Sequence, residues 1–271
     1  MNKKRLVLVL VAAAIAIYLW PEPAPEQAAR IPDPGALRHT MTGPVVGFAD
    51  QQDTLGWIGI PFAAPPVGEL RWAAPRLPEP WQEPRLATEY GSACVQLWGP
   101  LAGVAGSEGD VVGSEDCLYL NVWAPRVRSD PGTGSLPVMV WIHGGGNTIG
   151  TANTYPSGYL AGSENVVVVT INYRLGLLGW LSHSALRSGE RSERDASGNY
   201  GILDMIAALE WVQNNIANFG GDPDNVTIFG ESAGGRNVYS LMASPLANGL
   251  FHKAISQSGS VNTTPLWRAE N

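Results

Sequence analysis

Two short apolar runs, each bounded by polar residues, glycine or proline, set the strongest limit on how this chain can fold. They cover residues 137–142 and 165–171 and are rich in valine and isoleucine. Continuous apolar runs of this length are typical of strands that are buried on both faces of a parallel sheet. The sequence therefore predicts two central strands of such a sheet.

The apolar spacing changes between residues 202 and 216. Apolar residues there recur three and four positions apart, which predicts one buried stripe on a helix, and glycine and proline at 220–223 end it. Strands that alternate with helices indicate βαβ units. The predicted fold class is therefore α/β, with a mainly parallel central sheet and flanking helices. The further elements predicted are an edge strand at 57–63, strands at 118–123, 225–229 and 253–257, a helix at 238–242, and an exposed loop at 186–195.

Composition excludes several classes of protein. The 271 residues are 45% hydrophobic and 15% charged, which argues against disorder and fits one large domain or two small ones. The formal charge of −7 argues against nucleic-acid binding, since phosphate contacts need clustered lysine and arginine. Two cysteines without a Cys/His cluster give no support for a metal site, and no cofactor is expected.

The N-terminus has the pattern of an export signal. Basic residues at 3–5 precede an uncharged apolar run at 6–20, which is short for a bilayer span but suits a secretory signal. Residues 1–20 are therefore predicted to be a signal peptide or an uncleaved signal anchor, and both remain open. Residues 21–38 are predicted to be a Pro-rich linker. The expected location is periplasmic or secreted, with residues 6–20 as the candidate membrane anchor.

Export bears on whether the two cysteines are bonded to each other. In an oxidising compartment Cys94 and Cys117 are expected to form a disulfide. The alternative is two buried free thiols.

Residues 230–234, Gly-Glu-Ser-Ala-Gly, match the pattern G-x-S-x-G. They follow a predicted strand and precede a helix, which is the context of a nucleophile elbow. The glycines are needed because the turn strains the backbone and brings neighbouring elements close. The pattern predicts that Ser232 is a nucleophile and that the backbone N–H of Ala233 faces a developing oxyanion.

A second motif agrees with the first. His143-Gly144-Gly145-Gly146 follows the predicted strand at 137–142. Glycines expose backbone N–H groups, and an HGGG loop at this place is typical of the oxyanion loop of lipases and esterases. His143 is expected to orient the loop rather than to transfer a proton. The alternative is an ordinary Gly-rich turn.

With these motifs together, the sequence resembles the type B carboxylesterases, relatives of the cholinesterases in the α/β-hydrolase superfamily. The resemblance runs from about residue 43 to 267, and residues 39–271 would then be the N-terminal part of such a domain. The matching segments are 59–68, 70–72, 114–122, 172–176, 219–223 and 257–260.

The resemblance implies roles for individual residues. Ser232 would be acylated, and the oxyanion hole would be formed by Gly145, Gly146 and Ala233. Glu231 and Ser258 would belong to a polar network beside the catalytic residues; alternatively Glu231 is the variable residue of the elbow and Ser258 a turn serine. The resemblance also implies a Cys94–Cys117 disulfide.

One position departs from the family pattern. Asn147 follows the glycines where an aromatic residue is expected, which puts the acyl or alcohol pocket, and so the substrate preference, in question.

The acid and the histidine that would complete a catalytic triad with Ser232 are not found. In this fold the acid and then the histidine follow the nucleophile, but only His252 and Glu270 follow Ser232, in the wrong order. Family members are about twice as long. The favoured hypothesis is a serine carboxylesterase of small-molecule esters that is present here as an inactive fragment. The alternatives are a catalytically inactive cholinesterase-like binding module and a short hydrolase that uses Ser232 with His252.

Overall fold

The computed structural model describes residues 29–126, 135–187 and 189–261. The predicted signal or anchor at 1–20 lies outside these residues. Within the described part of the chain, no helix is long and apolar enough to cross a membrane.

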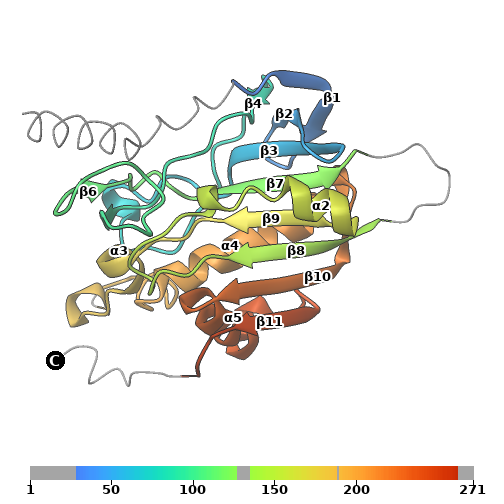
Figure 1. Ribbon diagram of the computed structural model, residues 1–271. Coiled ribbons are helices and arrows are strands. Elements are labelled where there is room, and N and C mark those ends of the chain that lie inside the picture. Colours follow the sequence, from blue (N-terminus) through green and yellow to red (C-terminus); the bar gives the residue numbers. More distant parts are fainter. Residues whose placement is uncertain (1–28, 127–134, 188, 262–271) are drawn as a thin grey trace, which may run out of the picture.

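One twisted sheet runs through the molecule (Figure 1). Its strand order is β1-β2-β3-β7-β9-β8-β10-β11, with β4 paired to β2. A separate small ribbon pairs β5 with β6. The strands are β1 (Pro32–His39), β2 (Pro44–Asp50), β3 (Thr54–Pro61), β4 (Arg85–Leu86), β5 (Gln96–Leu97), β6 (Val111–Val112), β7 (Tyr119–Pro125), β8 (Leu136–Ile142), β9 (Val167–Ile171), β10 (Gly221–Glu231) and β11 (Lys253–Gln257).

The second half of the sheet carries the predicted parallel order. Strands β9, β8, β10 and β11 are parallel neighbours, whereas the pairs from β1 through β7 to β9 are antiparallel. All five residues of β9 are buried, as its continuous apolar sequence predicts. The α/β fold class is thus confirmed.

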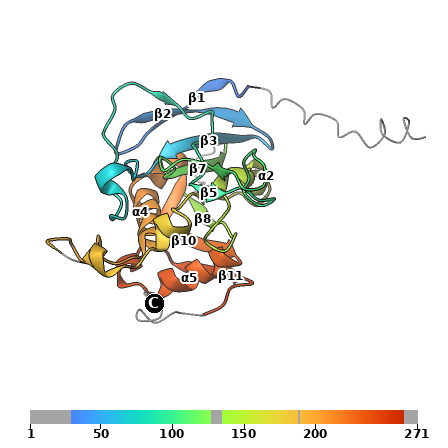
Figure 2. The same cartoon turned by 90° about the vertical axis from the view of Figure 1, so that its left-hand side faces the viewer.

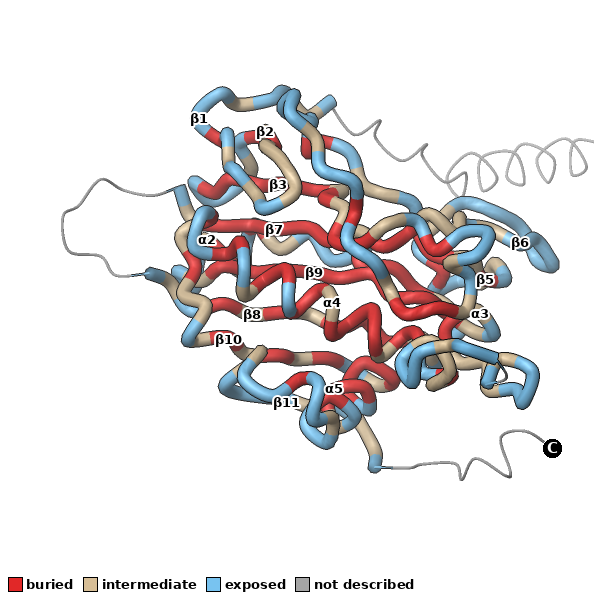
Figure 3. The backbone as a smooth tube through the Cα atoms, turned by 180° about the vertical axis from the view of Figure 1, so that it is seen from behind, coloured by how far each residue is buried: buried red, intermediate tan, exposed pale blue. Residues whose placement is uncertain are grey.

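Helices cover both faces of the sheet (Figure 2). Helices α4 (Tyr200–Asn215) and α5 (Ala233–Ala243) lie on one face, and the short α2 (Gly158–Glu164) lies on the other, against β7 and β9. A further short helix, α3 (Gly176–Trp180), packs against α4. Seen from the side of α4, the buried residues concentrate in the central strands and in the helices above them (Figure 3).

The periodic apolar stripe predicted for residues 202–216 matches α4. Its members Met205, Leu209 and Val212 are fully buried against the sheet. The helix ends at Asn215 and continues as a short 3-10 turn, which Gly220 closes in a left-handed conformation.

Three details differ from the sequence-based expectations. The segment 57–63, which was expected to be an edge strand, falls largely in β3. The expected edge position is wrong, because β3 pairs with both β2 and β7. Pro61 is the last residue of that strand, so no ladder is interrupted. The predicted linker at 21–38 overlaps β1, which pairs with β2. The helix expected at 238–242 begins earlier, at Ala233.

A buried ion pair ties α4 to the segment after β9. Both side chains are shielded from solvent, Arg174 being 3% exposed and Asp204 0%. The carboxylate accepts hydrogen bonds from Nη2 (2.7 Å), Nε (2.8 Å) and the backbone N–H (3.0 Å) of Arg174. This geometry satisfies the carboxylate, so removal of one partner would leave the other as an uncompensated buried charge.

We predict that Asp204→Ala lowers the free energy of unfolding by about 3–5 kcal/mol, because Arg174 is left buried without its counter-charge. Urea unfolding of the full-length protein measures this loss. The control is Glu210→Ala, an exposed position on the same helix, with an expected change within about 0.5 kcal/mol. Equal effects of the two substitutions would contradict the prediction.

Candidate active site

Ser232 lies in the sharp turn between β10 and α5. Its backbone has φ 55° and ψ −114°, a strained region for a residue other than glycine. The turn is held by the hydrogen bond from the Ser232 N–H to the carbonyl of Gln257 (2.9 Å) and by that from the Arg236 N–H to the carbonyl of Ser232 (3.0 Å). A strained serine between strand and helix is the geometry of a nucleophile elbow.

The elbow packs directly against the end of β8. A Cβ on Gly234 would lie 2.0 Å from the carbonyl oxygen of Ile142, and one on Gly230 would lie 2.7 Å from the same oxygen. Any side chain at position 230 or 234 would therefore collide with this carbonyl oxygen. The two glycines of the G-x-S-x-G pattern are therefore required by packing as well as by the turn.

The HGGG loop folds back beside the elbow. The carbonyl of Gly145 accepts hydrogen bonds from the N–H groups of Thr148 and Ile149, both at 3.0 Å. Gly145 and Gly146 have φ of 91° and 65°, which favours glycine at both positions. A Cβ placed on Gly144 would lie 3.4 Å from the Cβ of Ser232. The structure thus brings the predicted oxyanion loop next to the predicted nucleophile.

His143 is part of the scaffold of this loop. Its ring is buried and stacks on Tyr173, with centroids 4.3 Å apart and planes inclined by 15°. Its Nδ1 lies 2.9 Å from the carbonyl oxygen of Gly144, so Nδ1 carries the proton and donates. Burial lowers the pKa of His143 to about 4, although this hydrogen bond opposes the shift. The neutral ring agrees with a structural role.

The far end of the loop is held by a residue that sequence reasoning missed. The side-chain amide of buried Gln96 accepts from the N–H of Gly150 (2.8 Å) and donates to the carbonyl of Gly150 (3.0 Å). Gln96 lies two residues after Cys94, which is bonded to Cys117 in the structure. A lone glutamine has no sequence signal of such a role.

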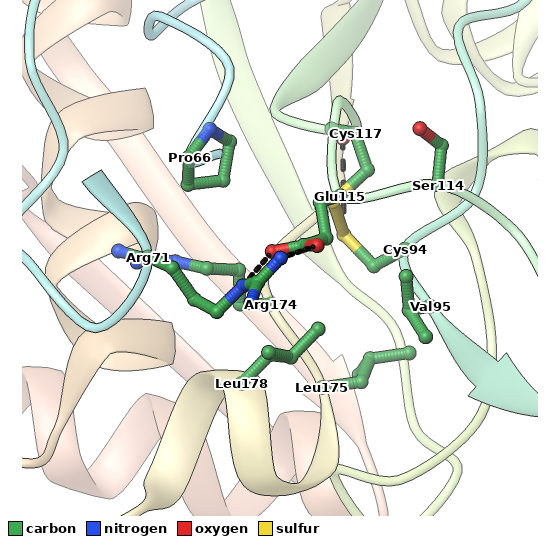
Figure 4. Close-up of a pocket in the computed structure, with 10 residues that line it drawn as sticks. All are labelled: Pro66, Arg71, Cys94, Val95, Ser114, Glu115, Cys117, Arg174, Leu175 and Leu178. Atoms are coloured by element: carbon green, nitrogen blue, oxygen red, sulfur yellow. Dashed lines mark hydrogen bonds and ion pairs between the residues drawn. A yellow bond between two sulfur atoms is a disulfide. The ribbon is translucent and has the colours of Figure 1, made fainter. Parts of the chain in front are cut away.

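The residues around this disulfide are shown in Figure 4. Arg71 and Glu115 form an ion pair with two hydrogen bonds, of 2.5 and 2.6 Å, at the rim of a small cavity beside the two cysteines. Both partners are partly exposed, so the ion pair adds little to the stability of the protein.

Asn147, the position that departs from the family pattern, turns its side chain toward other polar groups. Its amide forms hydrogen bonds with the amide of Asn237 on α5. The Tyr173 hydroxyl lies 3.4 Å from its Oδ1. Asn237 and Tyr173 are both buried and were not singled out from the sequence.

Glu231 and Ser258 both lie beside the elbow. Glu231 is exposed, and its Oε2 would lie 3.0 Å from a Cβ on Gly144. Ser258 has φ 54° and directly follows Gln257, whose carbonyl holds the turn.

Of the other histidines, His252 lies far from Ser232 along the fold. The Nδ1 of His252 accepts from the N–H of Val226, six residues before Ser232 on β10. At the rise of an extended strand this is roughly 20 Å from the nucleophile. His39 ends β1 at the opposite edge of the sheet, and His183 follows α3 and is exposed. Within the described residues, no group of three or more His, Cys, Asp or Glu is arranged to hold a metal ion.

A sequence model described as the carboxylesterase family matches residues 35–270. The chain belongs to the carboxylesterase family. This confirms the family resemblance stated from the motifs.

Named carboxylesterase relatives share close to half of the aligned residues. Fumonisin B1 esterase of Sphingopyxis macrogoltabida is 47% identical, over 85% of this chain and 41% of the relative. Pyrethroid hydrolase Ces2e of Rattus norvegicus is 48% identical, over 82% of this chain and 39% of the relative. The chain therefore spans about two fifths of the length of these curated relatives.

Solved carboxylesterase structures have the same fold. A thermophilic PNB esterase superimposes with a TM-score of 0.75 at 43% identity, covering 85% of this chain and 45% of the solved one. The carboxylesterase EST55 of Geobacillus stearothermophilus gives a TM-score of 0.69 at 42% identity, covering 81% and 43%. The carboxylesterase fold is thus recognised over most of the chain.

We predict a pH dependence of stability that His143 causes. Its pKa is about 4 in the folded protein and about 6.5 when unfolded. Between these values the unfolded state binds the extra proton, so the free energy of unfolding falls as the pH falls from 6.5 to 4, by up to about 3 kcal/mol. His143→Gln removes this contribution and flattens the profile, which urea unfolding at several pH values measures. The matched control is His183→Gln, and equal flattening in both variants would contradict the prediction.

Proposed function

We propose that the protein is a serine carboxylic-ester hydrolase that acts through an acyl-enzyme on Ser232. The observation that carries this proposal is the strained Ser232 turn lying against the glycine loop after β8. A nucleophile beside a set of exposed N–H donors suits acyl transfer.

The proposed reaction has two halves. The Ser232 oxygen attacks the ester carbonyl, and the negative charge of the tetrahedral intermediate is stabilised by the N–H groups of Gly145, Gly146 and Ala233. The alcohol leaves with a proton, and water then attacks the acyl-serine through a second tetrahedral intermediate. This releases the carboxylic acid and returns the proton to Ser232. No metal or organic cofactor enters these steps.

The proton transfers need a general base, and we propose that it comes from outside residues 1–271. His143 is buried with Nδ1 committed to Gly144, and His252 precedes β11 and lies beside Val226, far from Ser232. The short-hydrolase hypothesis with His252 as base is therefore not supported. The acid that orients the base would also come from outside these residues.

A catalytically inactive binding module is the second candidate function. A binding module needs the fold but not a strained serine, and strain of this kind costs about 1–3 kcal/mol that nothing would offset. The retained turn at Ser232 therefore favours the hydrolase. Small-molecule carboxylic esters are the proposed substrates, and no nucleic-acid partner is proposed.

We predict that an organophosphonate ester probe labels Ser232 of the full-length protein, because the phosphonyl group mimics the tetrahedral intermediate. Peptide mass spectrometry locates the label, and Ser232→Ala is expected to abolish both the label and ester turnover. The control is Ser240→Ala, an exposed serine on α5. A label elsewhere, or turnover that survives in Ser232→Ala, would refute the role of Ser232.

The separate chain of residues 21–271 serves as a second comparison in that experiment. Without a base, catalysis would rest on the oxyanion donors, which in the best-studied case give about 10³–10⁴-fold over water. Ile255 of β11 is 46% exposed, and β11 pairs with β10 on one side. We therefore propose that this separate chain has no measurable esterase activity and binds hydrophobic dyes. Ordinary ester turnover by 21–271 would overturn this part of the proposal.

We further propose that the protein is exported and that the Cys94–Cys117 bond forms there. Non-reduced peptide mapping of the exported protein is expected to show one linked pair, and residues 1–20 are expected to be either removed or retained as an anchor. The closed 94–117 loop should stabilise the protein by about 3 kcal/mol. Two alkylatable thiols in the exported protein would contradict the pairing.

A further inference from the structure

We propose that Asn147 and Asn237 form an amide clamp that positions the two halves of the oxyanion hole relative to each other. Both are positioning residues and neither touches the reacting atoms. This inference rests on the proposed esterase function and deepens it, because it explains how a residue that departs from the family pattern serves the same site.

The two side chains pair in both directions. The Asn237 Nδ2 donates to Asn147 Oδ1 at 2.8 Å, and the Asn147 Nδ2 donates to Asn237 Oδ1 at 3.3 Å. Asn237 is 2% exposed, on the first turns of α5. Because each amide offers a donor and an acceptor to the other, the pair fixes the orientation of both side chains.

Asn147 stands at the tip of the oxyanion loop. Its backbone has φ 60°, a left-handed conformation that asparagine tolerates better than most residues. Its carbonyl accepts a hydrogen bond from the Gly176 N–H at 2.7 Å. The tip is thus held both through its backbone, at the start of α3, and through its side chain, on α5.

The other supports of the loop hold different points. The Tyr173 hydroxyl donates to the carbonyl of His143 at 2.6 Å, which fixes the beginning of the loop. Burial raises the pKa of Tyr173 well above its usual range, so this hydroxyl keeps its proton and donates. Gln96 fixes the end of the loop at Gly150. The Asn147–Asn237 clamp acts between these two points, where the N–H groups of Gly145 and Gly146 lie.

The clamp matters because the oxyanion hole is assembled from two separate elements. Gly145 and Gly146 belong to the loop after β8, whereas Ala233 is the first residue of α5. Their N–H groups must converge on one oxygen, and catalytic groups need to be held to about 0.5 Å. Asn237 is four residues after Ala233 on the same helix, so the clamp ties the loop to the element that carries the third donor.

The expected loss of kcat is smaller than either of two reference effects. Loss of one oxyanion donor lowers kcat by about 10²–10³-fold, and a remote misplacement of about 1 Å can cost 10²-fold. Loss of the clamp leaves all three donors in place but lets the loop move. We therefore expect kcat to fall about 10-fold for either Asn147→Ala or Asn237→Ala, with KM changed by less than about 2-fold.

The test is a double-mutant cycle in the full-length enzyme. Asn147→Ala, Asn237→Ala and the double variant are compared for kcat, for KM and for inhibition by a trifluoromethyl ketone, which forms a tetrahedral oxyanion on the serine. If the pair acts as one unit, the double variant is no slower than either single variant, and inhibitor affinity falls in step with kcat. A merely structural role would not give this parallel loss. Asn237→Ser, too short to reach Asn147, is the second variant if the alanine variant fails to fold.

Ser240→Ala, one turn further along α5, is the matched control and is expected to keep wild-type kcat and inhibitor affinity. Independent, additive losses would overturn the clamp. It would also be overturned if Asn147→Ala shifted the acyl-length preference while Asn237→Ala kept wild-type kcat, since Asn147 would then be a pocket wall. Wild-type turnover with unaffected variants refutes the clamp alone, whereas a wild-type enzyme without turnover or Ser232 labelling refutes the proposed function as well.

Discussion

The close contact between the end of β8 and the turn after β10 is the constraint on which the rest of the site depends. β8 and β10 are parallel neighbours, so their carboxyl ends meet at one edge of the sheet, the usual position of ligand sites in open α/β folds. The missing side chains of Gly230 and Gly234 let the elbow rest on the carbonyl of Ile142. This contact puts the strained serine and the glycine loop side by side.

The loop that follows β8 could not keep its shape by itself. Three glycines in a row carry little conformational preference, and fixing each backbone residue costs about 1–2 kcal/mol. The structure offsets this cost with side chains from elements far apart in the sequence. Gln96 from the disulfide loop, Tyr173 after β9 and Asn237 on α5 each bind a different part of residues 143–150. Gln96 follows Cys94 by two residues, so the 94–117 loop contacts the end of the glycine loop through this side chain.

The sequence predicted the parts of the molecule that have a local physical signature. The buried valine run of β9, the apolar stripe of α4 and the glycines around Ser232 each follow from periodicity or sterics. Strand β1 was missed because its residues resemble a linker and it depends on pairing with β2. The edge position of β3 was a wrong inference, since strand order is a long-range property. Asn237 and Gln96 are ordinary polar residues whose roles arise from contacts 90 and 54 positions away.

The polar groups that shape the loop share one further property, which is that they are uncharged. His143 is neutral because burial lowers its pKa, Tyr173 keeps its proton, and Gln96, Asn147 and Asn237 are amides. In the proposed mechanism, a fixed negative charge here would oppose the developing oxyanion, and a fixed positive charge would favour anions in the ground state as well as in the transition state. These five supports avoid both effects, although the acidic side chain of Glu231 also lies beside Gly144. Preorganised dipoles stabilise charge only when the reaction creates it, which is the condition under which binding energy becomes rate.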